Sequence, residues 1–141
     1  MFSIALINSL IFFSLSVLHF YWLFGGTWGM DSVIPTNKKS TDKLFKPSHL
    51  SIIVVAIGLL VFAIIEIGNT DIFSNKLKLK YFQWGNLFIA FIFTIRAVGD
   101  FSHVGFFKRV RDSSFAKNDT RYYSPLCLYI ATTSLLIVFA S

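Results

Sequence analysis

The chain of 141 residues is 55% hydrophobic, only 14% charged, and carries a formal net charge of +6. Soluble globular domains average about 25% charged residues, so this composition excludes an ordinary soluble domain and predicts a membrane protein. The basic residues lie almost entirely between apolar segments, which favours membrane topology and lipid headgroup contact over nucleic-acid binding. The single cysteine, Cys127, excludes an intramolecular disulfide and a cysteine-rich metal site.

Four apolar stretches are long enough to cross a bilayer, whose hydrocarbon core is about 30 Å thick. They are predicted at residues 2–24, 48–67, 84–101 and 122–140. The expected fold is therefore all-α, with four transmembrane helices in a bundle that form a single integral membrane domain over residues 1–141. The first stretch is longer than the apolar core of a signal peptide and lacks a basic start, so we expect it to be retained.

Local signals mark the ends of these stretches. Interfacial aromatics followed by Gly25 and Gly26 end the first stretch, and Ser48 begins the second. Glu66 lies near the far end of the second stretch, where we expect its carboxylate to reach water. The Ser124-Pro125 pair predicts the start of the last helix, with Ser as the cap and Pro in the first turn.

The distribution of Lys and Arg predicts the orientation. The first and third connecting loops hold most of the basic residues, and the second holds fewer. Because cytoplasmic loops carry an excess of Lys and Arg, loops one and three are expected to be cytoplasmic and both termini outside. The expected location is the inner (plasma) membrane, crossed several times.

The most informative residues are Arg96 and Asp100, four positions apart in the third stretch. A charge within a membrane helix costs a few kcal/mol, so it is usually turned inward and paired. The spacing predicts a pair along one helix face, which is either a structural salt bridge or part of a functional site. Because a guanidinium has five N–H donors, a second acceptor is expected at Arg96.

Successive stretches cross the membrane in opposite directions. The ends of the first and third stretches therefore lie on the same side of the membrane as the starts of the second and fourth. Several polar and aromatic residues should therefore share one level of the bundle. The candidate ligand-binding residues are His19, Tyr21, Trp22, Arg96, Asp100, Tyr123 and Ser124.

The third loop combines aromatic residues with cations. Phe106 and Phe107 precede Lys108, Arg109 and Arg111, and these three cations are predicted to contact anionic headgroups. A basic loop that merely obeys the topology rule would look the same. Further along, Asp119 is expected to pair with Arg121 or to cap the turn before the last helix.

The sequence predicts neither a metal site nor a cofactor. His19, His49 and His103 are expected at a similar level, but they lack the spacing of metal ligands, and no Glu-x-x-His motif occurs. Cys127, one turn into the last stretch, is expected to be buried and inert. A catalytic thiol would need a histidine within hydrogen-bond reach.

Linked motifs give the chain a family resemblance. The segments 19–22 (HFYW) and 25–29 (GGTWG) are followed by 34–36 (IPT), and the second half contains RAVGDF at 96–101 and GFFK at 105–108. Phe115-Ala116, Asp119-Thr120 and 123–127 (YSPLC) complete the pattern. The chain resembles a family of small bacterial four-span integral membrane proteins catalogued only as a domain of unknown function. The resemblance implies the four-span fold but no activity, substrate or cofactor.

The leading functional hypothesis is a protein that binds or handles an anionic lipid or similar amphiphile near the face of loops one and three. Arg96 would hold the anionic group. One alternative is a membrane enzyme that uses His19, Arg96 and Asp100, although no nucleophile is evident. Others are a haem- or quinone-linked redox subunit and a structural or accessory subunit. The expected partners are membrane lipids and not nucleic acid, and a homo-oligomer or a membrane-protein partner is compatible with the sequence.

Overall fold

The computed structural model describes residues 1–35, 43–44, 46–70 and 76–140, with the side chains of 76–79 left out. Its elements are α1 (Phe2–Leu23), α2 (Met30–Val33), α3 (His49–Gly68), α4 (Lys76–Val98), α5 (Ser114–Asn118), η1 (Asp119–Tyr123) and α6 (Ser124–Phe139). The basic residues Lys38 and Lys39 of the first loop lie outside the described residues. The fold is all-helical in the part of the chain described, as predicted.

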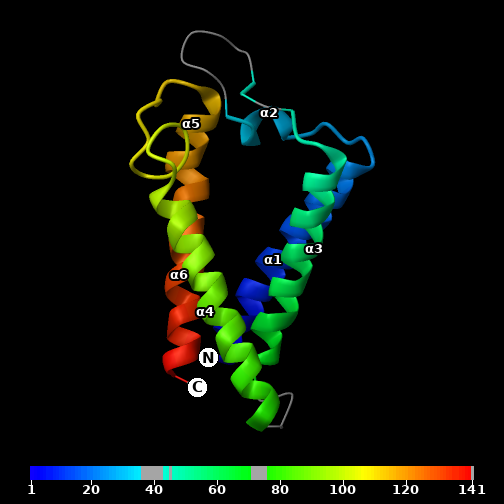
Figure 1. Cartoon of the computed structure of the whole chain (residues 1–141), viewed down its shortest axis with the longest axis vertical. Helices are drawn as coiled ribbons and strands as arrows, with labels where there is room; N and C mark the ends of the chain where they lie inside the picture. Colours follow the sequence, from blue (N-terminus) through cyan, green and yellow to red (C-terminus); the bar gives the residue numbers. More distant parts are fainter. Residues whose placement is uncertain (36–42, 45, 71–75, 141) are drawn as a thin grey trace.

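The four long helices form two antiparallel pairs (Figure 1). α1 packs most extensively against α3, and α4 against α6, whereas α3 and α4 form the main contact between the pairs. The pairs converge at the end that holds both termini and diverge at the opposite end, where α2 lies between them (Figure 1). The diverging end carries the first and third loops.

The apolar core draws on all four long helices. Its buried residues are Phe12, Leu59, Ala63, Ile89 and Ile130. Phe12 makes edge and tilted ring contacts with Phe62 and Phe93, at centroid distances of 5.6 and 5.4 Å. This aromatic cluster fills the middle of the bundle, between its two polar ends.

Small residues bring α1 and α3 close together. Ser9 and Ser16, seven residues apart on one face of α1, donate to the Ala63 and Ala56 carbonyls of α3 at 2.9 and 2.7 Å. Small side chains and hydroxyl-to-carbonyl bonds are typical of helix contacts in membranes, where the hydrophobic effect does not drive helices together. The seam therefore has the chemistry of a membrane-embedded interface.

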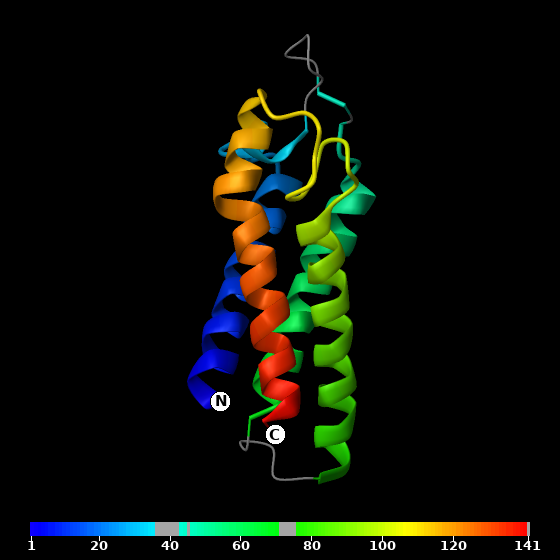
Figure 2. The ribbon, with the colours of Figure 1, turned by 90° about the vertical axis from the view of Figure 1, so that its left-hand side faces the viewer.

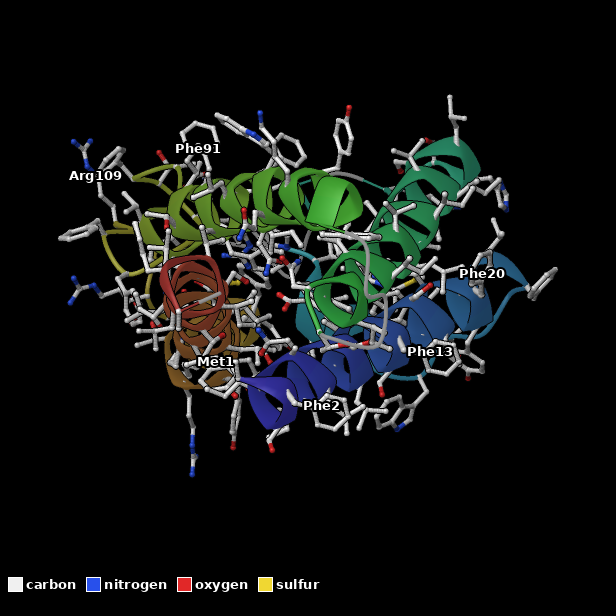
Figure 3. The ribbon with its side chains drawn as sticks, turned by 90° about the horizontal axis from the view of Figure 1, so that it is seen from below. Met1, Phe2, Phe13, Phe20, Phe91 and Arg109 are labelled. Carbon is white, nitrogen blue, oxygen red and sulfur yellow. The ribbon has the colours of Figure 1, made fainter. Side chains whose placement is uncertain are left out.

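The outer surface is strongly apolar. Phe2, Phe13 and Phe91 are about half exposed or more and lie on the outside of the bundle (Figure 3). Among the described residues, three helices are long and apolar enough to cross a membrane: Phe2–Leu23, His49–Gly68 and the continuous helix Ser114–Phe139. These three helices agree with a membrane protein, whereas α4 does not meet the same criterion.

α6 begins at Ser124 with Pro125 in its first turn, as the sequence predicted, but it continues α5 and the π-helical turn without a break. Ser113, not Ser124, is the cap, and its Oγ accepts from the Ala116 N–H at 3.1 Å. Ser124 and Pro125 lie inside a continuous helix. A proline within a helix clashes with the carbonyl four residues before it. Pro125 is preceded by a π-helical turn at Asp119–Tyr123, in which the Ser124 N–H bonds to the Asp119 carbonyl. That wider turn lets the helix pass through Pro125 unbroken.

The prediction for Glu66 is wrong. Its side chain does not reach water but is fully buried at the converging end. Its carboxyl is surrounded by polar side chains from the other long helices, which the sequence did not connect to it.

The turn after α4 depends on two glycines. Gly99 and Gly105 adopt φ angles of +89° and +86° and cross in direct contact. A Cβ on Gly105 would overlap the Gly99 backbone and the Val98 carbonyl, and one on Gly99 would overlap the Val104 carbonyl. The Phe106 N–H then bonds to the Ala97 carbonyl at 2.8 Å, which folds the third loop back onto the end of α4.

We expect Gly105→Ala to lower the free energy of unfolding by at least about 1–3 kcal/mol, because alanine is strained at positive φ and would meet backbone atoms. Gly58→Ala is the control, since a Cβ there meets nothing within 4 Å, and it should change stability by no more than about 1 kcal/mol. Thermal unfolding in mild detergent measures both. Equal stability of the two variants would contradict the glycine crossing.

Candidate functional site

Asp119 is the centre of the polar site at the diverging end. Its fully buried carboxylate accepts from Arg96 Nη2 through Oδ1 at 2.9 Å. Oδ2 accepts from Lys108 Nζ at 3.0 Å and from the Gly105 N–H at 2.8 Å. One carboxylate thus joins α4, the third loop and the π-helical turn.

Lys108 is buried in this site, contrary to the prediction of headgroup contact. Only 2% of the residue is exposed. Its ammonium donates to the Gly105 carbonyl at 2.9 Å, to Asp119, and to Thr120 Oγ1 at 2.6 Å. A lysine has three N–H donors, so all three are used internally. Lys108 is a structural cation within the loop.

The predicted pair between Arg96 and Asp100 is not formed. α4 ends at Val98, and Gly99 turns the chain before Asp100, so the helical spacing that would have paired them is lost. Asp100 Oδ1 instead accepts from the backbone N–H groups of Ser102, His103 and Val104 at 2.7–2.9 Å. Asp100 therefore shapes the loop.

These hydrogen bonds also set the acidity of Asp100. Partial burial acts to raise the pKa of the Asp100 carboxyl, but the N–H bonds from Val104, His103 and Ser102 hold that pKa below its usual range. A lowered pKa contributes stability above the ordinary pKa of aspartate, and this stability is lost as the pH falls through the lowered value. Because Asp100 is exposed to solvent, this contribution is small.

Arg96 is the charged member of the site that reaches the surface. Its side chain is 32% exposed, while its Nη1 is buried and has no hydrogen-bond partner among the described residues. Arg96 and Lys108 bring two positive charges to the single carboxylate of Asp119. The cluster therefore carries one surplus positive charge and an unpaired donor.

Tyr123 and Ser124 lie at the end of the π-helical turn. The Tyr123 hydroxyl donates to the Ser32 carbonyl at 3.1 Å and so ties α2 to the last helix. Ser124 is fully buried, and its Oγ has no partner among the described residues. Cys127 is buried one turn later, as predicted.

His19, Tyr21 and Trp22 lie at the end of α1 and make local contacts. His19 Nδ1 lies 2.8 Å from the Leu15 carbonyl, and its ring packs edge-on to Trp22 at 4.9 Å. Trp22 Nε1 donates to the Trp28 carbonyl at 2.8 Å, and the Tyr21 hydroxyl accepts from the Trp28 N–H at 3.4 Å. These contacts hold the turn after α1, and none of them reaches Arg96 or Asp100.

The other predicted headgroup cations, Arg109 and Arg111, are exposed. Arg109 points outward from the bundle in Figure 3, and Arg111 Nε donates to the Lys108 carbonyl at 3.4 Å. Across the part of the chain that is described, no three His, Cys, Asp or Glu residues are grouped to hold a metal ion.

Sequence reasoning missed the role of Asp119, which was expected to contact Arg121 or to cap a turn. Arg121 instead lies over the Tyr122 ring, 5.3 Å from its centroid. One signal was available in the sequence. Two cations, Arg96 and Lys108, lie in or beside an apolar segment and need a carboxylate partner, and few acidic residues follow them in the chain. Only folding could select Asp119, because it lies 23 residues after Arg96.

The fold and composition are those of an α-helical membrane protein with a buried ionic site at one end. The chain belongs to the family DUF3995, described as proteins of unknown function, whose profile matches residues 12–134. That match covers all the motifs from His19 to Cys127. Comparisons with curated proteins and with solved structures found no match.

Replacing Asp119 with Asn should lower the free energy of unfolding by about 3–5 kcal/mol, because it leaves the buried Lys108 and the half-buried Arg96 without a counter-charge. The exposed Asp112→Asn removes the same charge elsewhere and should cost no more than about 0.5 kcal/mol. Thermal unfolding in detergent compares the two. A loss no larger than that of the control would show that the ionic site does not hold the loop.

Proposed function

We propose that the chain is a four-span membrane protein that binds the anionic group of a lipid or similar amphiphile at Arg96. The observation that carries the proposal is the unbalanced ionic cluster, in which Arg96 keeps a buried, unpaired Nη1 beside a single shared carboxylate. A phosphate or carboxylate would accept from Nη1 and neutralise the surplus charge. Arginine suits this task because its planar fork holds Asp119 with one nitrogen and a ligand oxygen with the other.

The position of Arg96 supports access from the membrane. Its side chain is partly exposed, whereas Lys108 and Asp119 are sealed. It lies near the end of α4, at the level where the helix pairs diverge (Figure 1). The headgroup would lie at this interfacial depth, with the apolar tail along the helices below it.

α4 is the fourth span in this proposal. It runs alongside α6 for most of its length (Figures 1 and 2) and contributes buried Ile89, Ala90 and Ala97 to the bundle interior. Its lower hydropathy has a physical reason, since its first turns carry Lys76, Lys78 and Lys80 and its last turn carries Arg96. Charges at both ends of a span can lie at the two interfaces.

The proposed orientation places the diverging end at the cytoplasmic face of the inner (plasma) membrane, with both termini outside. Exposed cations support it, because they gather at this end: Lys43, Lys46, Arg109, Arg111, Lys117 and Arg121. Exposed Phe107 beside Arg109 would enter the interface while the cation meets anionic headgroups.

Catalysis by His19 has less support than binding. Its ring contacts Leu15 and Trp22 of its own helix, and no contact among the described residues links it to Arg96 or Asp100. Binding at Arg96 is compatible with a protein that acts alone, as a homo-oligomer or beside a membrane-protein partner.

The test is the mass of lipid retained by the protein in native mass spectrometry after extraction in mild detergent and exchange into phosphatidylglycerol. Arg96→Lys keeps the charge at Asp119 but removes Nη1, so we expect at least about a tenfold loss of bound phosphatidylglycerol. Lys80→Gln removes an exposed cation at the opposite end of α4, so it is the control and should retain wild-type binding. Phosphatidylcholine should bind weakly to all three proteins.

Retention of phosphatidylglycerol by a folded Arg96→Lys variant at the wild-type level would overturn the assignment of the site. The Arg96–Asp119 pair would then be a structural salt bridge. Thermal unfolding of each variant shows whether a change in binding follows from a change in folding.

A further inference from the structure

A second polar cluster lies at the converging end, remote from Arg96. Asn8 of α1 donates through Nδ2 to Glu66 Oε1 of α3 at 3.2 Å and to Thr133 Oγ1 of α6 at 3.0 Å. Ser134 of α6 donates to the same Glu66 Oε1 at 2.8 Å. Asn86 of α4 lies next to this carboxyl group. All four long helices therefore meet at Glu66.

The two oxygens of the Glu66 carboxyl group differ in their hydrogen bonds. Oε1 has two donors, but Oε2 is buried and has no partner among the described residues. The side-chain Oδ1 and Nδ2 of the neighbouring Asn86 also have no hydrogen-bond partner among the described residues. Glu66 and Asn86 are both 0% exposed. Glu66 Oε2 and the Asn86 amide thus lie close together in the bundle interior with unused hydrogen-bonding capacity.

Among the described residues, no charged side chain is bonded to Glu66. The groups that face it from α1, α4 and α6 are amides and hydroxyls. Lys80, six residues before Asn86 on α4, is exposed and lies about 9 Å further along that helix. Arg96 lies ten residues along α4 from Asn86, which is about 15 Å of helix, and is already paired with Asp119. A lone carboxylate at this depth would carry a large desolvation penalty.

We propose that Glu66 is a proton-binding site, in which the neutral carboxylic acid donates from Oε2 to Asn86 Oδ1. One proton, taken up from water, removes the buried charge and gives Oε2 a hydrogen that the Asn86 amide oxygen can accept. A larger cation such as sodium would need several oxygen ligands, whereas most oxygens of this cluster are already engaged in hydrogen bonds.

The bound proton stabilises the contact between the two helix pairs. The bonds from Asn8 to Thr133 and from Ser134 to Glu66 both cross from the α1–α3 pair to α6. These contacts lie at the end where the pairs converge (Figure 1). Loss of the proton would leave a bare negative charge at that contact and weaken it.

The sequence offers a direct measurement, because Glu66 is the only glutamate among the 141 residues. Cell-free synthesis with glutamate carrying ¹³C at the side-chain carboxyl labels this one group in the full chain. After reconstitution in phosphatidylcholine vesicles, infrared and solid-state NMR spectra should report a protonated carboxylic acid at neutral pH. A carboxylate signal at neutral pH, with or without sodium, would overturn the proposal.

Variants provide a second and independent test. Glu66→Gln replaces the proposed O–H donor by an N–H donor of similar shape, so it should match the wild-type unfolding temperature at neutral pH. At alkaline pH the wild type should unfold at a lower temperature than Glu66→Gln, because only the wild type can ionise at this site. Asp112→Asn is the matched control and should keep the wild-type pH dependence. If Glu66→Gln shows the same alkaline loss as the wild type, Glu66 is not the proton-binding group.

Discussion

The buried carboxylate of Asp119 holds together the polar end of this protein. It receives a guanidinium from α4, an ammonium from the third loop and a backbone N–H from Gly105, all within 2.8–3.0 Å. A buried charge is tolerated only when it is paired and hydrogen-bonded. The glycine crossing and the inward position of Lys108 bring two of these donors to the same carboxylate. The surplus charge at Arg96 is the consequence of sharing one carboxylate between two cations.

The two ends of the bundle accommodate their buried polar groups in different ways. At the diverging end, charge is compensated by charge, and the surrounding loops are basic and partly exposed. At the converging end, a single acid on α3 is surrounded by neutral amides and hydroxyls from the other three long helices. Between them lies an apolar core centred on Phe12. Such an arrangement places polar groups where helices need directional contacts, since apolar side chains gain little from one another in a lipid environment.

The family motifs acquire a structural meaning from this arrangement. In RAVGDF and GFFK, Arg96 and Lys108 provide the cations, Gly99 and Gly105 provide the crossing, and Asp100 anchors the loop backbone. The early aromatic motif around Trp22 closes the turn after α1 through the Trp28 carbonyl. A match over residues 12–134 spans both ends of the bundle, so the family pattern describes a scaffold that surrounds Arg96.

The sequence by itself determined the class of protein, the helical character and the approximate position of the apolar segments, because composition and hydrophobic length are local properties of the chain. It also identified Arg96 as a residue that needs an acceptor, since a guanidinium in an apolar segment cannot remain unpaired. Only the tertiary structure decided which acceptor it is. A spacing of four residues indicated Asp100, but the helix ends before that residue and Asp119 arrives from 23 residues away. The same holds for Glu66, whose burial depends on Asn8 and Ser134, 58 and 68 residues distant along the chain. Pairings at such separations are set by how the helices pack, which no local pattern encodes.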